Sequence, residues 1–366
     1  MTHPPDGRAV LGLLPEELAA EFALSPPFRA RQVFSSLWQG ARSFSAMTSL
    51  PLSLRESLAA RAEIYHGAIT ETLRAPDGTV KARIEFAGPP GGENTVIEAV
   101  VLRDRAGRRT ACVSSQGGCA LGCGFCKTGT LGFTRNLTAG EMCEQFLALE
   151  NISGPLGSLV FMGMGEPLLN LEAVLQTIRV LNHRDGRNLS PRRITVSTAG
   201  IIGGIYALAE RGLPVRLAVS LPAADESLRR ALMPGTPDFS LGDLRRALLH
   251  YAEKTGRRCT LEAVLLSGVN TGRDCIRGLA DFAKRTRCHV NLIPWNAVEG
   301  LPFTPPTPEE CRDALAVLTE EGVNGTLRMS RGGAVAGACG QLGGQRKAPS
   351  APSALPGPAD SVTIGL

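Results

Sequence analysis

Three cysteines stand close together in the stretch CALGCGFC, at Cys119, Cys123 and Cys126. Thiolates are ligands for soft metals and for iron–sulfur clusters. A structural zinc site normally closes with four ligands, and disulfides need cysteines in pairs. Three thiolates on one loop can instead hold three irons of a [4Fe–4S] cube and leave the fourth iron open. We therefore expect these cysteines to be the metal ligands of a [4Fe–4S] cluster.

Two other interpretations of the cysteines compete with a cluster. A zinc site would need a fourth ligand. Cys112 could supply it, whereas the nearest histidines in the sequence, His66 and His183, are remote. The cysteines could also be small buried hydrophobes, which is the usual role of a free cysteine. Three of them within eight residues of a glycine-rich loop are unlike a core pattern, so the cluster is favoured.

The elements that must position this loop form a repeating pattern from residue 110 onward. Short apolar segments alternate with longer amphipathic ones, which indicates a parallel sheet with helices outside. The span from 110 to 343 is shorter than the ~250 residues of a full eight-unit barrel, so we expect an α/β fold with a partial (βα)6 barrel. The expected strands are 110–115, 156–164, 192–198, 213–221, 257–266 and 288–295.

The polar residues that follow these strands are candidates for one site. In α/β barrels the site lies at the C-terminal ends of the strands. The residues found there are the Cys119–Cys126 loop, Gly163–Glu166, Ser197, Ser220 and Trp295–Asn296. We expect them to converge.

The rest of the chain divides into three further parts. Residues 8–65 contain three segments with helical apolar spacing and are expected to form a small helical domain. Residues 66–105 alternate like strands, and Asp77-Gly78 predicts a hairpin in this β extension. The barrel is expected over 106–343, and the Pro/Ala/Ser-rich residues 344–366 are expected to be a disordered tail.

Composition narrows the class of protein without naming a function. The formal charge is +5, from 39 Lys and Arg against 34 Asp and Glu, which is compatible with a nucleic-acid partner. We found no apolar run long enough to span a bilayer and no signal peptide, so we expect a cytoplasmic protein with no membrane partner. Ten cysteines without an export signal argue against a disulfide scaffold.

Several motifs together resemble a known family. C-x3-C-x2-C after the first strand of a partial barrel resembles the radical S-adenosylmethionine (SAM) superfamily. The motifs CVSSQGGCALGCGFC, GFTRNLTAGE, VFMGMGEPLLN, NLIPWN and GACGQL resemble the RlmN/Cfr family of radical SAM RNA adenosine methyltransferases. The resemblance covers most of residues 10–343, including the N-terminal helical part, and implies that residues 8–65 are an accessory domain that binds RNA.

The resemblance implies two cofactors and a radical reaction. In the superfamily the open iron of the cluster is chelated by the amino and carboxylate groups of SAM. C2 of adenine is an electron-poor carbon without a lone pair, so direct attack on the methyl group of SAM is implausible. A radical route removes the need for a nucleophilic carbon.

The resemblance also implies roles for two cysteines and a glutamate outside the loop. Cys339 matches the cysteine that a first SAM methylates. A second SAM, cleaved by an electron from the cluster, gives a 5′-deoxyadenosyl radical that takes hydrogen from this methyl group, and the carbon radical then adds to adenine. Cys112 matches the cysteine that releases the product by forming a disulfide with Cys339. Glu98 matches the residue proposed to accept the ring proton.

Contacts to SAM follow from the same resemblance. Gly165 and Glu166 match the segment that meets the methionine amino group. The positions that match contacts to the nucleoside or carboxylate are Ser197, Ser220, Leu221, Pro222 and Asn296. Pro222 departs from the family, in which histidine is usual, and this removes a side-chain contact while leaving backbone contacts possible.

The resemblance leaves the exact product open. PLLN after GMGE and the PWN motif resemble the branch that methylates C2 of adenosine in 23S rRNA, and some relatives also modify the tRNA adenosine beside the anticodon. Lys127 in FCKTGTLGF keeps the branch that methylates C8 of adenosine as an alternative.

An iron–sulfur RNA-binding protein without methyl transfer is a further alternative. The presence of Cys339 in its motif argues against it. No expected strand leads into G-x-G-x-x-G, which excludes a Rossmann-type methyltransferase. We expect a monomer that receives electrons from a donor such as flavodoxin or ferredoxin.

Overall fold

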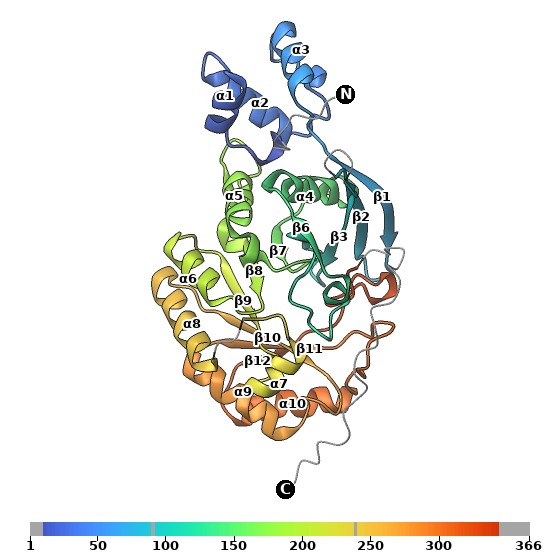
Figure 1. Ribbon diagram of the computed structural model, residues 1–366, viewed down its shortest axis with the longest axis vertical. Coiled ribbons are helices and arrows are strands. Elements are labelled where there is room, and N and C mark those ends of the chain that lie inside the picture. Colours follow the sequence, from blue (N-terminus) through green and yellow to red (C-terminus); the bar gives the residue numbers. More distant parts are fainter. Residues whose placement is uncertain (1–9, 89–91, 238–239, 344–366) are drawn as a thin grey trace.

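One ten-stranded sheet runs through the structure, a computed structural model that describes residues 10–88, 92–237 and 240–343 (Figure 1). Its strand order is β1-β2-β3-β4-β7-β8-β9-β10-β11-β12. The first four strands pair antiparallel, and every pair from β4 to β12 is parallel. The antiparallel strands are β1 (Gly67–Arg74), β2 (Val80–Phe86), β3 (Thr95–Arg103) and β4 (Arg109–Cys112).

The parallel half confirms the expected α/β class. Its strands follow one another in chain order, as expected for a partial (βα)6 barrel. The six expected strands correspond to β4 and β7 to β11, and β12 is a seventh that was not predicted. The strands after β4 are β7 (Ser158–Phe161), β8 (Ile194–Thr198), β9 (Arg216–Ser220), β10 (Thr260–Leu265), β11 (His289–Pro294) and β12 (Gly325–Leu327).

Helices accompany the parallel strands on the outside (Figure 1). They are α4 (Ala139–Ser153), α5 (Leu171–Asn182), α6 (Ile202–Glu210), α7 (Glu226–Leu232), α8 (Leu241–Thr255), α9 (Arg273–Thr286) and α10 (Pro308–Glu320). No helix within the described ranges is both long and apolar enough to cross a membrane.

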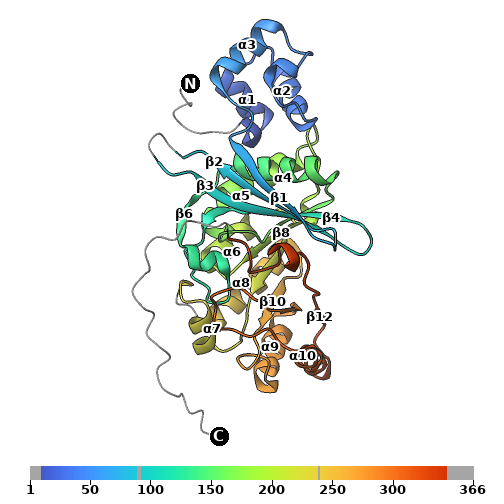
Figure 2. The same cartoon turned by 90° about the vertical axis from the view of Figure 1, so that its right-hand side faces the viewer.

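Three further helices precede the sheet, namely α1 (Pro15–Phe22), α2 (Phe28–Trp38) and α3 (Leu52–Arg61). Figures 1 and 2 both place them beyond α4 and α5, at the end of the molecule remote from α9 and α10. Gln176 on α5 donates to the carbonyl of Gly12 at 3.0 Å and to the carboxylate of Glu17 at 2.6 Å, which joins this part to the sheet layer.

The predicted domain ranges stay predictions. The expected hairpin at Asp77-Gly78 is present between β1 and β2. These strands continue the main sheet, because β3 pairs with β4, so no break in hydrogen bonding marks the expected boundary at 105 and 106. Residues 344–366, for which a disordered tail was predicted, lie outside the described residues.

A small second sheet brackets the cysteine loop. It consists of β5 (Gln116–Gly118) and β6 (Phe133–Asn136), which pair antiparallel and were not predicted. Cys119 donates its amide to the carbonyl of Gly132 at 2.8 Å and so begins the loop directly beside this pair. Gly118 has a φ of +75°, and a Cβ here would lie 1.8 Å from the Gly132 oxygen, so only glycine fits.

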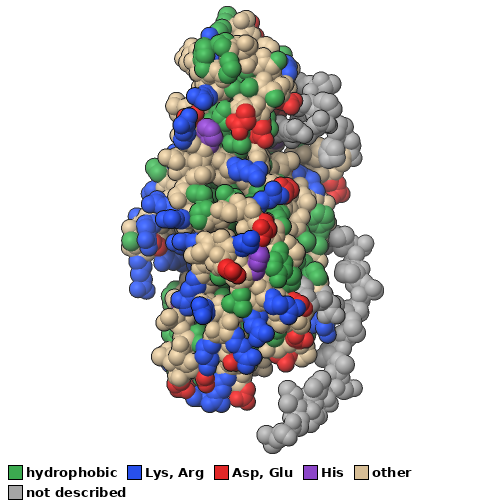
Figure 3. All heavy atoms as spheres, turned by 90° about the vertical axis from the view of Figure 1, so that its left-hand side faces the viewer, with side chains coloured by type: hydrophobic (Ala, Val, Ile, Leu, Met, Phe, Trp, Pro, Cys, Tyr) green, Lys and Arg blue, Asp and Glu red, His purple; other side chains and the backbone are tan. Residues whose placement is uncertain are grey.

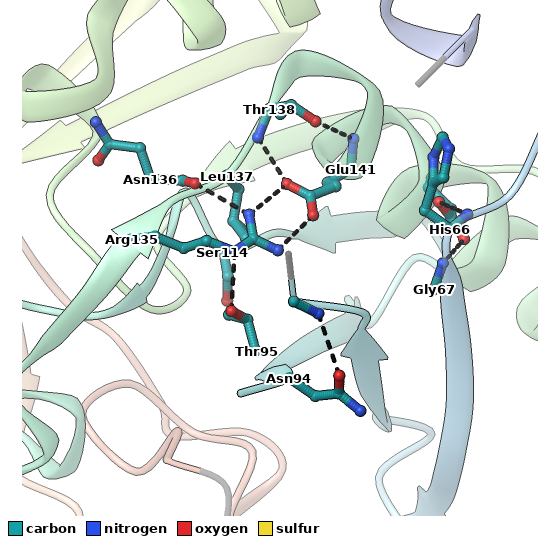
Figure 4. Close-up of polar contacts among 12 residues, drawn as sticks. His66, Gly67, Asn94, Thr95, Ser114, Arg135, Asn136, Leu137, Thr138 and Glu141 are labelled. Atoms are coloured by element: carbon teal, nitrogen blue, oxygen red, sulfur yellow. Dashed lines mark hydrogen bonds and ion pairs between the residues drawn. The ribbon is translucent and has the colours of Figure 1, made fainter. Parts of the chain in front are cut away.

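The start of α4 is tied to this second sheet. The predicted capping box is present, since Thr138 Oγ1 accepts from the Glu141 amide at 3.2 Å and Glu141 accepts from the Thr138 amide at 2.8 Å. Figure 4 shows that the same carboxylate meets the guanidinium of Arg135 on β6, with the closest approach 2.6 Å. Glu141 therefore connects the helix start with the strand that closes the cysteine loop.

We predict that Glu141→Ala lowers the free energy of unfolding by about 2 to 3 kcal/mol. The change removes one half of the capping box, typically worth ~1 kcal/mol, and leaves the half-buried Arg135 without its carboxylate. The midpoint of urea denaturation measures the effect. Glu309→Ala is the matched control, because Glu309 also lies in the first turn of a helix but is exposed. Equal midpoints for the two variants would contradict the prediction.

Candidate functional site

The cysteine loop is anchored at several points along its length. Its backbone is bonded to the end of α7, to the turn after α7, to the C-terminal segment and to the loop after β11. These contacts, between 2.7 and 2.9 Å long, join Gly124 to Leu232, Leu121 to Gly235, Lys127 to Gly340 and Phe125 to Trp295. Segments from three distant parts of the sequence therefore fix the loop that carries the cysteines.

The three thiols of the loop lie close enough to influence one another. Burial is the main cause that raises the pKa of Cys119 to about 11, and the nearby Cys126 and Glu166 contribute to this rise. Burial also raises the pKa of Cys123, to which Cys126, Cys119 and Glu166 add. Cys119 and Cys123 are therefore protonated in the absence of a positive partner, and ligation of a metal would release their protons.

The arrangement of these donors fits a cluster better than a single metal ion. Within the described ranges, no group of three or more Cys, His, Asp and Glu side chains is placed to hold one ion. In a [4Fe–4S] cluster each thiolate binds a different iron atom, so the sulfur atoms do not have to meet around one point. Cys112, the fourth ligand of the zinc alternative, has its pKa raised by burial and by Cys339, and not by the loop cysteines.

The predicted SAM segment Gly165-Glu166 follows β7 and lies against the residues that lead into the cysteine loop. Glu166 donates its amide to Gln116 Oε1 at 2.8 Å. Gly165 has a φ of +98°, and a Cβ here would lie 2.5 Å from that of Gln116, so the close approach requires glycine. The fold thus places this segment next to the predicted cluster ligands.

The side chain of Glu166 points toward the end of β8. Its carboxylate accepts from the amides of Leu168 at 3.0 Å and Ala199 at 2.7 Å. Burial raises its pKa to about 7, against these two hydrogen bonds and one from Thr198. The carboxylate therefore joins the segment after β7 to the end of β8.

The other predicted SAM residues lie at the ends of neighbouring strands. Ser197 stands on β8 and Ser220 ends β9, and both are half-buried. Leu221 donates its amide to Glu262 at 2.9 Å, and Pro222 accepts from the Asn270 side chain at 2.8 Å. The backbone at Pro222 is therefore fixed although a histidine side chain is missing. Among the described residues, no hydrogen bond joins Ser197 or Ser220 to the cysteine loop.

The two cysteines that are far apart in the sequence lie near enough in the fold for Cys339 to raise the pKa of Cys112. Cys112 ends β4, and burial together with the neighbouring Cys339 raises its pKa to about 12. Asn296 donates its side-chain amide to the carbonyl of Cys339 at 3.1 Å. Burial is also the largest cause that raises the pKa of the Cys339 thiol, to which Cys126 of the loop contributes.

Access to Cys339 differs from access to Cys112. Cys112 is buried, whereas Cys339 is exposed as a residue even though enough protein surrounds its thiol to raise the pKa. Of the two cysteines, Cys339 is therefore the residue that a large substrate can approach.

Glu98 lies on β3 beside the segment that carries Cys339. Its carboxylate forms an ion pair with Lys81 at 3.1 Å and accepts from the amide of Gly343 at 2.9 Å. Its own amide contacts Met164 Sδ at 3.4 Å, and Met164 lies just before Gly165. The residue predicted to accept a proton is therefore close to both the C-terminal segment and the predicted SAM segment.

Sequence reasoning missed two buried charged residues at this site. Lys81 stands on β2 and would have been found by pairing β2 with β3. Glu262 on β10 accepts from Asn291 at 2.9 Å and lies 3.6 Å from Arg328, and burial raises its pKa. An acidic residue within the apolar strand CTLEAVLL was the available signal. Arg328 lowers and Glu262 raises the pKa of Cys339, so both lie near this cysteine.

Comparison with known proteins agrees with this geometry. Residues 113–282 match the radical SAM superfamily. This family uses a [4Fe–4S] cluster together with SAM, so both expected cofactors are confirmed for the chain. A crystal structure of a radical SAM methyltransferase from Sphaerobacter thermophilus superposes with a TM-score of 0.86 at 40% identity, over 91% of this chain and 98% of that one.

Curated relatives extend the match over nearly the whole chain. A protein of Treponema pallidum named probable dual-specificity RNA methyltransferase RlmN is 46% identical over 92% of this chain and 97% of its own length. A protein of Nitratidesulfovibrio vulgaris named dual-specificity RNA methyltransferase RlmN is 42% identical over 91% of this chain and 94% of its own. The chain therefore belongs to the RlmN family of radical SAM RNA methyltransferases.

Proposed function

We propose that this RNA methyltransferase acts on C2 of an adenosine in 23S rRNA and also on the tRNA adenosine beside the anticodon. The motifs GMGEPLLN and NLIPWN favour the C2 branch of the family. The names of the relatives describe them as dual-specificity enzymes, which supports two kinds of RNA substrate.

The proposal is supported most by the influence of Cys339 on Cys112, whose pKa it raises, and by the influence of Cys126 of the cysteine loop on the pKa of Cys339. A methyltransferase that passes the methyl group directly from SAM to a nucleophile needs no cysteine pair. Two cysteines at one site, one exposed and one buried, suit transfer through a covalent protein intermediate.

Each side chain has a proposed role in this scheme. Cys119, Cys123 and Cys126 hold the cluster, and the segment from Gly165 to Glu166 binds SAM together with Ser197, Ser220, Leu221, Pro222 and Asn296. When bound, the cluster and SAM supply the methyl group and the radical that activates it. Cys339 carries the methyl carbon to adenine, Glu98 accepts the ring proton and Cys112 displaces the product from Cys339 by forming a disulfide.

The surface is compatible with an RNA partner. Lys and Arg predominate among the charged side chains on the face shown in Figure 3, in keeping with the net charge of +5. Such a surface attracts phosphates, and the acidic side chains between the basic ones limit the strength of this attraction. The N-terminal helices as an RNA-binding part, the electron donor (flavodoxin or ferredoxin), the monomeric state and the cytoplasmic location stay predictions.

The test uses anaerobically reconstituted enzyme, a reductant, SAM with a deuterated methyl group, and protein-free 23S rRNA or tRNA. Mass spectrometry of the digested RNA identifies the product. We expect 2-methyladenosine that keeps two of the three deuteriums, because one is removed at the Cys339 stage. 8-Methyladenosine would assign the C8 branch. An intact cluster that cleaves SAM without methylating either RNA would contradict the proposal.

We predict that the two distant cysteines fail in different ways. Cys339→Ala abolishes product because no residue can carry the methyl group, whereas Cys112→Ala leaves RNA covalently bound to Cys339. Denaturing electrophoresis of labelled RNA measures the adduct. Cys275→Ala, on the outer helix α9, is the control and should turn over normally. Normal turnover of Cys112→Ala without adduct would refute the two-cysteine scheme.

We also predict that Cys123→Ala lowers the iron and sulfide content to below about a quarter of the wild-type value, since the cluster loses one of only three protein ligands. Colorimetric iron and sulfide assays after anaerobic reconstitution measure the loss. The Cys275→Ala control should retain the wild-type content. Full iron and sulfide in Cys123→Ala would remove this residue from the ligand set.

A further inference from the structure

Lys81 is a buried lysine on β2 to which the scheme above gives no role. Its Nζ lies 3.1 Å from Glu98 Oε1 and 3.3 Å from the carbonyl oxygen of Ala336. The side chains of Lys81 and Glu98 are only 9% and 6% exposed. A lysine is rarely buried to this extent unless it is paired, so the pair requires an explanation.

The register of the sheet places this pair on the face of the predicted site. Lys81 is opposite Val100 on β3, and Val100 is opposite Cys112 on β4. Glu98 lies two residues from Val100, so its side chain points to the same face. Lys81, Glu98 and Cys112 therefore share one face of the antiparallel strands.

The pair also holds the segment that carries Cys339. Lys81 donates to Ala336 before this cysteine, and the second carboxylate oxygen of Glu98 accepts from the amide of Gly343 after it, at 2.9 Å. The segment is thus bonded to the same ion pair on both sides of Cys339. A shift of the Glu98 carboxylate would disturb its bond to Gly343 and its ion pair with Lys81.

Stability alone does not account for the pair. Two well-packed apolar side chains often stabilise a buried position as well as an ion pair does, because desolvation offsets the Coulombic attraction. An ion pair fixes direction, since the carboxylate oxygens have to point at their donors. The arrangement is therefore suited to orienting one carboxylate group.

We propose that Lys81 is a positioning residue that holds the Glu98 carboxylate in the orientation in which it accepts the ring proton, next to the Cys339 segment. The inference rests on the role proposed above for Glu98. Other contacts hold the segment without Lys81. Gly332 donates to Asp77 at 2.7 Å, Lys127 to Gly340 at 2.7 Å and Asn296 to Cys339 at 3.1 Å.

The experiment separates methylation of the carrier from transfer to RNA. Lys81→Met, Glu98→Gln and the double variant are reconstituted anaerobically, and intact-protein mass spectrometry measures the methylated fraction of Cys339. Single-turnover reactions with RNA then measure product formation from methylated enzyme. Arg187→Met is the control for loss of a partly buried ion pair, because Arg187 pairs with Glu150 away from the site.

We expect Lys81→Met to methylate Cys339 to within about twofold of the wild-type level, because the other contacts keep the segment in place. Product formation should fall about 100-fold, near the lower end of what a positioned proton acceptor contributes. The double variant should be no slower than Glu98→Gln, since residues that act as one unit are not additive. It also removes both buried charges, so a folding defect caused by one unpaired charge would be relieved. Arg187→Met should react like the wild type.

Several results would overturn the proposal. Product formation by Lys81→Met within about threefold of wild type, with Glu98→Gln inactive, would show that Glu98 needs no orienting lysine while its own role stands. Losses that multiply in the double variant would mean that the two residues act separately. If Lys81→Met does not methylate Cys339, the role of Lys81 is only to hold the segment that carries this cysteine. Full activity of Glu98→Gln would instead refute the proton-acceptor role in the proposed function, and the inference with it.

Discussion

The position of Cys339 depends on hydrogen bonds from elements that are distant in the sequence. The segment from Ala336 to Gly343 belongs to no helix or strand of the structure. It is held by Lys81 and Glu98 of the antiparallel strands, by the cysteine loop through Gly340 and by Asn296 after β11. If these contacts were lost, the segment would have no ladder or helix of its own to keep the thiol in place. The antiparallel strands thus act as a support for the site as well as an edge of the sheet.

The same support explains how one site could serve cysteines with different tasks. Cys112 ends a buried strand and is fixed by the sheet, whereas Cys339 lies on a segment held only by individual hydrogen bonds. A carrier has to meet more than one partner in turn, and a segment without regular structure can move between them at lower cost than a strand. Burial and the neighbouring Cys339 raise the pKa of the Cys112 thiol to about 12, so this thiol is protonated at neutral pH.

Much of the fold could be predicted because its signals are local. The alternation of apolar strands and amphipathic helices, the capping box at Thr138 and the hairpin at Asp77-Gly78 depend on neighbouring residues, and all are present. The three residues of β12 were too few to show a period. The β5 and β6 pair was missed because glycine dominates β5.

The site could be predicted only in part, for a related reason. Spacing alone indicated the cysteine loop, whereas Cys112, Cys339 and Glu98 depended on the family resemblance, since nothing local marks them. Lys81 was missed because its partner lies on another strand, and only the register of β2 with β3 reveals it. Buried charges on adjacent strands are therefore the feature for which three-dimensional structure adds most here.

The central claim, that Cys112 and Cys339 work as a pair at one site, can be measured after a single turnover without thiol reductant. The protein is alkylated under denaturing conditions and digested, and mass spectrometry quantifies the peptides that contain the two cysteines. The account predicts a disulfide between Cys112 and Cys339 in an amount equal to the methylated adenosine formed. Product formed while both thiols remain free and are alkylated would contradict it.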